Sequence, residues 1–158
     1  MTDKKAMDVL GKAVYGCYLM TVKSGDMING MPLSLFMQTG FDPPMVACGV
    51  SPKRRTHQMV KDAGSFAVVF LKKDQADLVD AFKIKGEDPG KKYDGVDWEE
   101  GETGAPLLKD CLGYVECRLV DSFSPGDHTM FIGEVVNSKL VSEGELLTIQ
   151  DLDKHYSG

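Results

Sequence analysis

The longest pair of strand-like segments in the chain constrains its fold most. Residues 113–123 and 129–141 are rich in β-branched and aromatic side chains, and the four residues between them, Ser124-Pro125-Gly126-Asp127, have the composition of a tight turn. A turn this short joins two strands that run antiparallel. The last part of the chain is therefore predicted to form a long antiparallel hairpin.

The rest of the chain adds shorter elements and few helices. Strands are predicted over residues 15–22, 29–38 (irregular), 45–50 and 66–71, and helices over 3–13, 55–63 and 75–82. Residues 84–102 are polar and glycine-rich, which predicts a long ordered loop. About six strands and three short helices do not alternate as parallel βαβ units require. The pattern predicts an all-β fold with peripheral helices, built as a mainly antiparallel barrel.

The length of 158 residues predicts one domain over residues 1–158. The longest strongly apolar run, residues 66–71, is far shorter than the roughly 20 residues that span a bilayer, and the first residues lack an apolar signal core, so we expect a cytoplasmic protein without membrane contact. Four cysteines without a Cys-x-x-Cys pair are expected to be reduced and buried. The spacing of His57, His128 and His155 predicts no metal site.

Charge is distributed unevenly along the chain. The net charge of −6 argues against nucleic acid and anionic lipid as partners. Residues 53–92 nevertheless hold 10 basic and 6 acidic side chains, whereas the remainder holds 8 basic and 18 acidic ones. A basic segment in an otherwise acidic chain is suited to binding a small anion.

Within the basic segment, the sequence Ser51-Pro52-Lys53-Arg54-Arg55-Thr56-His57 runs from a predicted strand into a predicted helix. Hydroxyls, cations and free helical N–H groups at such a junction bind phosphate. A plain N-terminal cap at Thr56 beside a solvated arginine pair explains the same residues. Lys83 and Lys85 follow the next helix and either complete a phosphate clamp or lie on an ordinary surface loop.

Other motifs are weaker on their own. His128 follows Gly126-Asp127 at the rim of the sheet, where a solvated histidine beside a capping aspartate is an equally simple interpretation. The glycines of segment 86–92 are too close together for a phosphate loop, and no Ser or Thr follows its lysines.

Taken in order, the motifs resemble the flavin reductase-like family of FMN-binding split barrels, and most closely its ferric reductase and flavoredoxin branch. The resemblance covers residues 9–158. The matching blocks are Tyr15-Gly16-Cys17-Tyr18-Leu19-Met20-Thr21, Asn29-Gly30, Ser34 to Gln38 before Asp42-Pro43-Pro44, Thr56-His57, Ser65-Phe66-Ala67-Val68, Phe82-Lys83 with Lys85, Lys92-Tyr93-Asp94-Gly95-Val96, Gly104-Ala105-Pro106-Leu107, Glu116-Cys117, Gly126-Asp127-His128-Thr129, Ile132-Gly133-Glu134-Val135, Leu147-Thr148-Ile149 and His155-Tyr156.

The resemblance implies a six-stranded antiparallel Greek-key split barrel that forms a homodimer, with FMN near the dimer interface and NADH or NADPH as electron donor. It places His128 near the nicotinamide as the catalytic residue. The cofactor-binding residues that it implies are Ser51, Lys53, Thr56, His57, Lys83 and Lys85 around the phosphate, Met31, Pro32, Leu33, Ser34, Leu35 and Phe36 along the isoalloxazine edge, and Asn29 and Phe82 from the matching blocks.

Three functions follow as expectations. The first is an NAD(P)H-dependent flavin or ferric reductase that passes electrons from FMN to free flavin, a ferric complex or a small redox protein. The second is a flavoredoxin-like FMN carrier that accepts electrons from a protein donor. The third is a non-redox barrel that binds another phosphorylated ligand or only a protein partner, because Pro32 and Leu35 stand where relatives often carry hydroxyl side chains.

Overall fold

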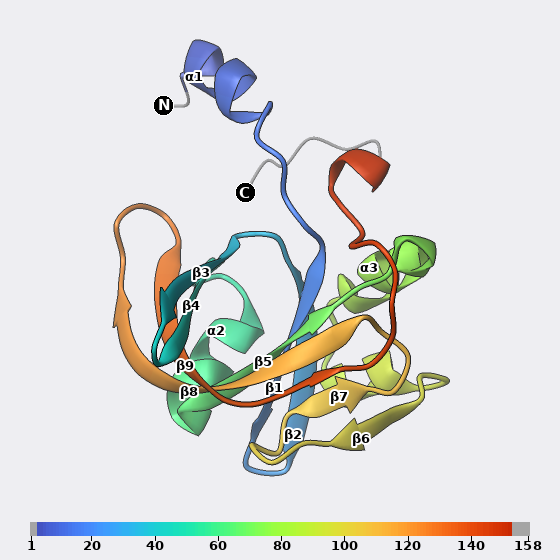
Figure 1. Ribbon diagram of the computed structural model, residues 1–158. Coiled ribbons are helices and arrows are strands. Elements are labelled where there is room, and N and C mark those ends of the chain that lie inside the picture. The colour runs from blue at the N-terminus through green and yellow to red at the C-terminus, as the bar shows by residue number, and fades with distance from the viewer. Residues whose placement is uncertain (1–2, 153–158) are drawn as a thin grey trace.

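The computed structural model describes residues 3–152 and forms a split barrel around one long antiparallel sheet (Figure 1). The sheet has seven strands in the order β2-β1-β5-β8-β9-β4-β3, one more than the six predicted. The strands are β1 (Tyr18–Ser24), β2 (Met27–Leu33), β3 (Phe36–Phe41), β4 (Pro44–Val50), β5 (Ser65–Phe70), β8 (Gly113–Phe123) and β9 (Thr129–Leu140).

The predicted C-terminal hairpin is confirmed and forms the spine of the sheet. β8 and β9 pair antiparallel over their whole length, from Gly113 opposite Leu140 to Phe123 opposite Met130. Two register shifts interrupt the ladder, one after Glu116 and one after Leu119. Bulges of this kind bend and twist a strand, and they let the hairpin contribute to both halves of the barrel.

The additional strand arises because the single irregular strand predicted over 29–38 is in fact two. β2 pairs with β1 at one edge of the sheet, and β3 pairs with β4 at the other edge. The chain crosses between the edges at Ser34 and Leu35, which are not the glycine or proline residues that mark most turns. Pro32, which has no N–H to donate, fits in β2 because that strand is an edge strand.

The three predicted helices are present, with small changes at their ends. They are α1 (Lys4–Leu10), α2 (Arg55–Ala63) and α3 (Ala76–Phe82). Asp3 caps α1 through its side chain, and Gly64 ends α2 with a left-handed backbone (φ 67°). A 3₁₀ turn, η1 (Lys73–Gln75), precedes α3. α1 is shorter than predicted because Gly11 closes it.

The prediction of a loop over 84–102 is wrong for part of that segment. It contains a 3₁₀ turn, η2 (Pro89–Tyr93), and strand β6 (Trp98–Glu100), which pairs with β7 (Pro106–Leu108) in a separate two-stranded sheet. Strands of three residues are too short to show an alternating pattern in sequence. A last 3₁₀ turn, η3 (Gln150–Leu152), ends the described chain.

The central strands are buried on both faces. Met20 and Val68 lie in the barrel interior, whereas the neighbouring Leu19 and Val69 pack with Phe82 in a second cluster beneath α3. The four cysteines are buried, as expected, and are not joined in disulfides. Within residues 3–152, no helix is long and apolar enough to cross a membrane, and no group of three His, Cys, Asp or Glu side chains is placed to hold a metal ion. His155 and Tyr156, expected to close the domain, lie outside the described residues.

Candidate functional site

A cavity of about 590 Å³ opens between β2, the turn before α2, α3 and the β8–β9 hairpin. This volume lies within the roughly 300–1,000 Å³ typical of small-molecule sites. Its lining residues are Cys17, Tyr18, Met31, Pro32, Leu33, Ser34, Gly49, Ser51, Lys53, Arg54, Val79, Lys83, Lys85, Asp127, His128, Ile149 and Leu152. The set combines an apolar floor with a basic rim.

The basic rim gathers side chains from two distant parts of the chain. Lys53 and Arg54 come from the turn before α2, and Lys83 and Lys85 follow the end of α3. Lys83 also lies 3.6 Å from the Asp80 carboxylate, an exposed pair. The structure thus brings together two basic clusters that are separated along the sequence.

The turn before α2 is shaped to accept an anion. The backbone N–H of Lys53 donates to Ser51 Oγ (3.3 Å), and that of Arg54 donates to Ser51 O (3.0 Å). Arg54 is the N-cap of α2 and makes no side-chain capping bond within the described chain. No side chain caps the first turn of the helix, and the helix dipole favours negative charge near this end.

Thr56 does not cap α2, so the capping part of that alternative is wrong, whereas Arg54 and Arg55 are both exposed. Thr56 lies inside the helix, is almost fully buried, and its hydroxyl accepts a hydrogen bond from Asn29 Nδ2 (3.3 Å). Lys92 Nζ in turn donates to Asn29 Oδ1 (3.0 Å). Asn29 and Thr56 support the basic turn from behind and do not line the cavity.

His128 lies on the hairpin side of the cavity, fixed by its neighbour. Its Nδ1 is 2.8 Å from Asp127 Oδ1, and the imidazole is 17% exposed. The hydrogen bond and charge of His128, together with the charge of Lys53, lower the pKa of the Asp127 carboxyl below its ordinary value. Asp127 therefore stays ionised and holds the imidazole by Nδ1, which leaves Nε2 for a ligand.

His57 is buried behind the site rather than within it. Its Nε2 lies 2.8 Å from Thr129 Oγ1, and its ring packs on Phe131. Burial and, to a lesser degree, the charge of Lys61 lower the pKa of His57. This neutral histidine joins α2 to the first residue of β9, next to His128.

The aromatic residues are divided between the floor and the core. Tyr18 lines the cavity, and the ring of Phe36 packs against it at a tilt of 46°, with ring centroids 4.7 Å apart. Phe82 is fully buried beside Tyr93 in the cluster under α3. Leu35 packs over Gly49, where an added Cβ would come within 2.9 Å of the leucine. Phe36, Phe82 and Leu35 thus support the walls without lining them.

The segment that follows β9 provides a wall that sequence reasoning missed. Leu147 O accepts from the N–H of Cys17 (2.7 Å), and Thr148 bridges to Gly16, so the segment lies along the entry to β1. Ile149 and Leu152 reach the cavity from this segment. Ile149 belongs to a block that carries the family resemblance, but nothing in the sequence indicates that its N–H donates to Tyr15 O (2.9 Å), near the other end of the chain.

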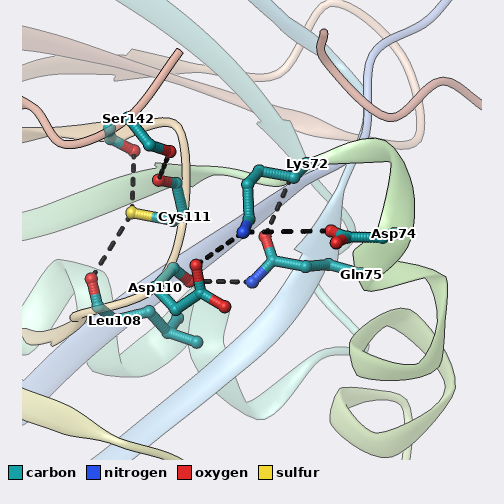
Figure 2. Close-up of polar contacts among 8 residues, drawn as sticks. Lys72, Asp74, Gln75, Leu108, Asp110, Cys111 and Ser142 are labelled. Atoms are coloured by element: carbon teal, nitrogen blue, oxygen red, sulfur yellow. Dashed lines mark hydrogen bonds and ion pairs between the residues drawn. The ribbon is translucent and has the colours of Figure 1, made fainter. Parts of the chain in front are cut away.

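A polar cluster anchors this wall and the start of α3 (Figure 2). Lys72 Nζ lies 2.6 Å from Asp110 Oδ1, and Gln75 Nε2 donates to Asp110 O (2.8 Å). Ser142 Oγ donates to Cys111 O (2.7 Å). Burial raises the pKa of the Cys111 thiol to about 11, so this thiol stays protonated and is a packing group rather than a nucleophile.

Of the residues predicted for the site, nine line the cavity: Met31, Pro32, Leu33, Ser34, Ser51, Lys53, Lys83, Lys85 and His128. The other six, Asn29, Leu35, Phe36, Thr56, His57 and Phe82, do not line it. The cavity residues not predicted for the site include Tyr18, Arg54, Asp127, Ile149 and Leu152. Arg54 stands within the predicted phosphate motif, which is the one signal that marked it.

Chemically, the cavity suits a planar, largely apolar group that carries a phosphate. Tyr18, Leu33 and Val79 offer a dry platform, and Lys53, Arg54 and Lys85 offer cations at one end. A phosphorylated flavin has this shape, so the residues present fit FMN.

Comparison with known proteins agrees with this fit. The family described as flavin reductase like domain matches residues 10–157. The ferric-chelate reductase (NAD(P)H) of Archaeoglobus fulgidus is 29% identical over 142 residues, which cover 89% of this chain and 84% of that protein. The high molecular weight rubredoxin of Moorella thermoacetica is 30% identical over 148 residues, which cover 92% of this chain and 63% of the relative. The present chain thus spans less than two thirds of that protein.

One similar solved structure is the NADH:FAD oxidoreductase SgcE6 of Streptomyces globisporus C-1027, determined in complex with NAD and FAD fragments. It matches with a TM-score of 0.83 and 29% sequence identity, and the match covers 94% of this chain and 90% of that chain. Fold, cavity and sequence agree, and the chain belongs to the flavin reductase-like family.

Proposed function

We propose that this chain binds FMN in the large cavity and uses NADH or NADPH to reduce it. The observation that carries the proposal is that an apolar floor, a basic rim and His128 line the same cavity. Relatives described as a ferric-chelate reductase (NAD(P)H) and an NADH-dependent FAD reductase support it.

The residues have separable roles in this proposal. Lys53, Arg54, Lys83 and Lys85 neutralise the phosphate, which is more than one cation can do for a group with nearly two negative charges. Backbone groups of residues 31–34 in and after β2 face the ring edge. Tyr18, Val79 and Ile149 exclude water from the ring.

Bound FMN supplies the redox chemistry, since it accepts a hydride and can release electrons singly or in pairs. The protein needs no strong acid or base for hydride transfer, which fits a cavity without a catalytic triad or a carboxylate pair. His128, held by Asp127, orients the nicotinamide against the ring. Free flavin, a ferric complex or a partner protein is the acceptor. Four buried cysteines that form no disulfide suit a reducing compartment, and we place the protein in the cytoplasm.

A flavoredoxin-like carrier is the second candidate. It is favoured by the relative described as a high molecular weight rubredoxin, a protein longer than this chain. Such a carrier would bind FMN tightly and take electrons from a protein donor rather than from a nicotinamide.

Flavin titration followed by stopped-flow mixing tests these candidates. We expect FMN to bind the purified protein and its absorbance to bleach rapidly on mixing with NADH or NADPH. Tight FMN binding without bleaching by either nicotinamide favours the carrier. A protein that stays colourless and shows no spectral change with added FMN contradicts both.

The variant His128→Ala distinguishes FMN binding from FMN reduction by the nicotinamide. Because His128 faces the donor rather than the flavin phosphate, we expect the rate of FMN reduction to fall roughly tenfold to a hundredfold while FMN affinity changes less than about twofold. Asp127→Asn keeps the ring and is expected to lower the rate less. Equal losses of rate and FMN affinity in His128→Ala would show that the residue holds the flavin instead.

A further inference from the structure

The turn between β8 and β9 carries His128 past the end of the hairpin ladder. The ladder ends where Phe123 pairs with Met130, so residues 124–128 project beyond it. Within the described part of the chain, residues 124–128 make no backbone–backbone hydrogen bond. The placement of His128 therefore depends on side chains that tie this turn to the rest of the molecule.

Thr129, the first residue of β9, lies at the centre of these ties. It is buried, and its Oγ1 lies 2.8 Å from His57 Nε2 and 3.3 Å from Ser124 Oγ. A hydroxyl has one donor and two acceptor positions, so it can donate to one of these partners and accept from the other. The Thr129 hydroxyl thus joins the buried His57 of α2 to Ser124, where the turn begins.

His57 is itself held firmly in place on α2. Its ring is buried and packs on Phe131, with ring centroids 5.2 Å apart. Its backbone N–H donates to Arg54 O (3.1 Å), and Arg54 lines the large cavity. Burial and, to a lesser degree, the charge of Lys61 lower the pKa of His57, so the imidazole is neutral at neutral pH. One side chain therefore connects the basic turn before α2 with the turn that carries His128.

Asp127 cannot anchor this turn, although it orients the imidazole of His128. Its carboxylate lies 2.8 Å from His128 Nδ1, but it is 98% exposed and belongs to the same turn, so it moves with the histidine. α2, in contrast, packs into the barrel interior through Met59 and Val60. The link that fixes His128 relative to the barrel thus runs through His57.

We propose that His57 is a positioning residue for His128. Through the Thr129 hydroxyl, it fixes the turn at residues 124–128 relative to the basic turn before α2. The inference rests on the proposed function and deepens it, because it names the group that sets how far His128 lies from the phosphate-binding end of the cavity. Hydride transfer requires close approach, and a misplacement of about 1 Å can slow a reaction about a hundredfold.

His57→Phe and Thr129→Val each remove the link and keep a side chain of similar shape. The FMN-loaded protein is mixed in a stopped-flow instrument with the nicotinamide that reduces the wild type faster. We expect each variant to reduce FMN about fivefold to tenfold more slowly. FMN affinity should change less than about twofold, because neither residue lines the cavity.

Two further variants serve as matched controls. Thr129→Ser keeps the hydroxyl and should retain the wild-type rate. Gln58→Ala removes an exposed side chain at the next position of α2 and should also match the wild type. If either His57→Phe or Thr129→Val fails to fold, the other variant decides the outcome.

A double-mutant cycle with His128→Ala distinguishes positioning from a general loss of structure. If His57 acts through His128, adding His57→Phe to His128→Ala slows reduction less than about twofold further. Losses that multiply would contradict the positioning role. A wild-type rate in the single variants, or an equal loss of FMN affinity, would contradict it as well.

A readout without flavin separates this inference from the proposed function. In the FMN-free full chain, we expect the backbone order parameters of residues 124–128 from ¹⁵N relaxation to fall from about 0.85 toward about 0.6 in His57→Phe and Thr129→Val. They should not change in Gln58→Ala. Unchanged order parameters in both link variants overturn the positioning role. A wild-type protein that binds no FMN overturns the proposed function, and the order parameters still decide whether His57 fixes the turn.

Discussion

Among the cations of the large cavity, Lys53 gives a direct test of phosphate binding. It lines the cavity on the turn before α2, and its charge reaches Asp127 on the opposite wall. Lys53→Ala removes one charge-assisted contact to the phosphate, so we expect FMN binding to weaken by roughly 1.5–3 kcal/mol, measured by fluorescence titration. The control is Lys61→Ala, which removes an exposed lysine within α2 and outside the cavity. Unchanged FMN affinity in Lys53→Ala would place the phosphate elsewhere.

At the same scale, the two departures from the family's usual residues have different consequences. Pro32 lines the cavity and cannot donate a backbone hydrogen bond to the ring edge. Leu35 packs over Gly49 behind the wall, so its missing hydroxyl removes nothing from the lining. Only the substitution at Pro32 therefore bears directly on how the ring is held.

At the scale of elements, Glu116 attaches the small β6–β7 sheet to the barrel. The side chain is fully buried on β8 and accepts hydrogen bonds from the backbone of Glu102, from the backbone and hydroxyl of Thr103, and from Asn137 Nδ2. Burial raises the pKa of the Glu116 carboxyl, but these hydrogen bonds outweigh burial and leave the pKa below its ordinary value. A carboxylate with a lowered pKa stabilises the fold above its ordinary pKa, and this contribution is lost as the pH falls through the lowered value.

Glu116→Gln replaces one of the two acceptor oxygens with an NH₂ group, which is a donor. The four groups that bond this side chain are also donors, so the new NH₂ group cannot accept from them. We expect the free energy of unfolding at neutral pH to fall by about 1–3 kcal/mol in urea titrations, because two or more donors lose their partner. The variant should also lose part of the decline in stability below about pH 4.5, since the ionisable group is gone. Glu143→Gln, at an exposed position, should leave both quantities unchanged. A wild-type stability profile in Glu116→Gln would refute the anchoring role.

Helices and strands were predicted well from the sequence where residues at their own ends or turns determine them. Helix α2 was predicted with the bounds that it has, because Gly64 ends it, and the hairpin of β8 and β9 was marked by its turn. The break at Ser34 and the three-residue strands β6 and β7 carry no local signal. In the site, the basic turn and β2 could be predicted, whereas the wall formed by Ile149 and Leu152 depends on contacts between the two ends of the chain.

At the scale of the whole molecule, the half of the sheet beside the cavity has an apolar outer face. Met37 pairs with Ala47, and Ala47 pairs with Ile132, so the three side chains lie in one row across β3, β4 and β9 on the face opposite the barrel interior. Met37 is exposed, Ile132 is partly buried and Ala47 is buried. Met45 and Met130 lie on the same face in neighbouring rows. β3 is also an edge strand with an open row of backbone groups. We propose that a second copy of the chain covers this face, as expected for a homodimer.

Met37→Asp tests this assembly, because Met37 is 58% exposed and does not line the cavity. Wild-type protein should elute with twice the 17.3 kDa mass of the chain in size-exclusion chromatography with light scattering. Burying an aspartate without a partner in an apolar interface costs several kcal/mol, so we expect the variant to elute as a monomer at micromolar concentration. Leu140→Asp changes an 81% exposed leucine at the far end of β9 and should remain dimeric. A monomeric wild type, or a Met37→Asp protein that still dimerises, would assign the apolar row to another role.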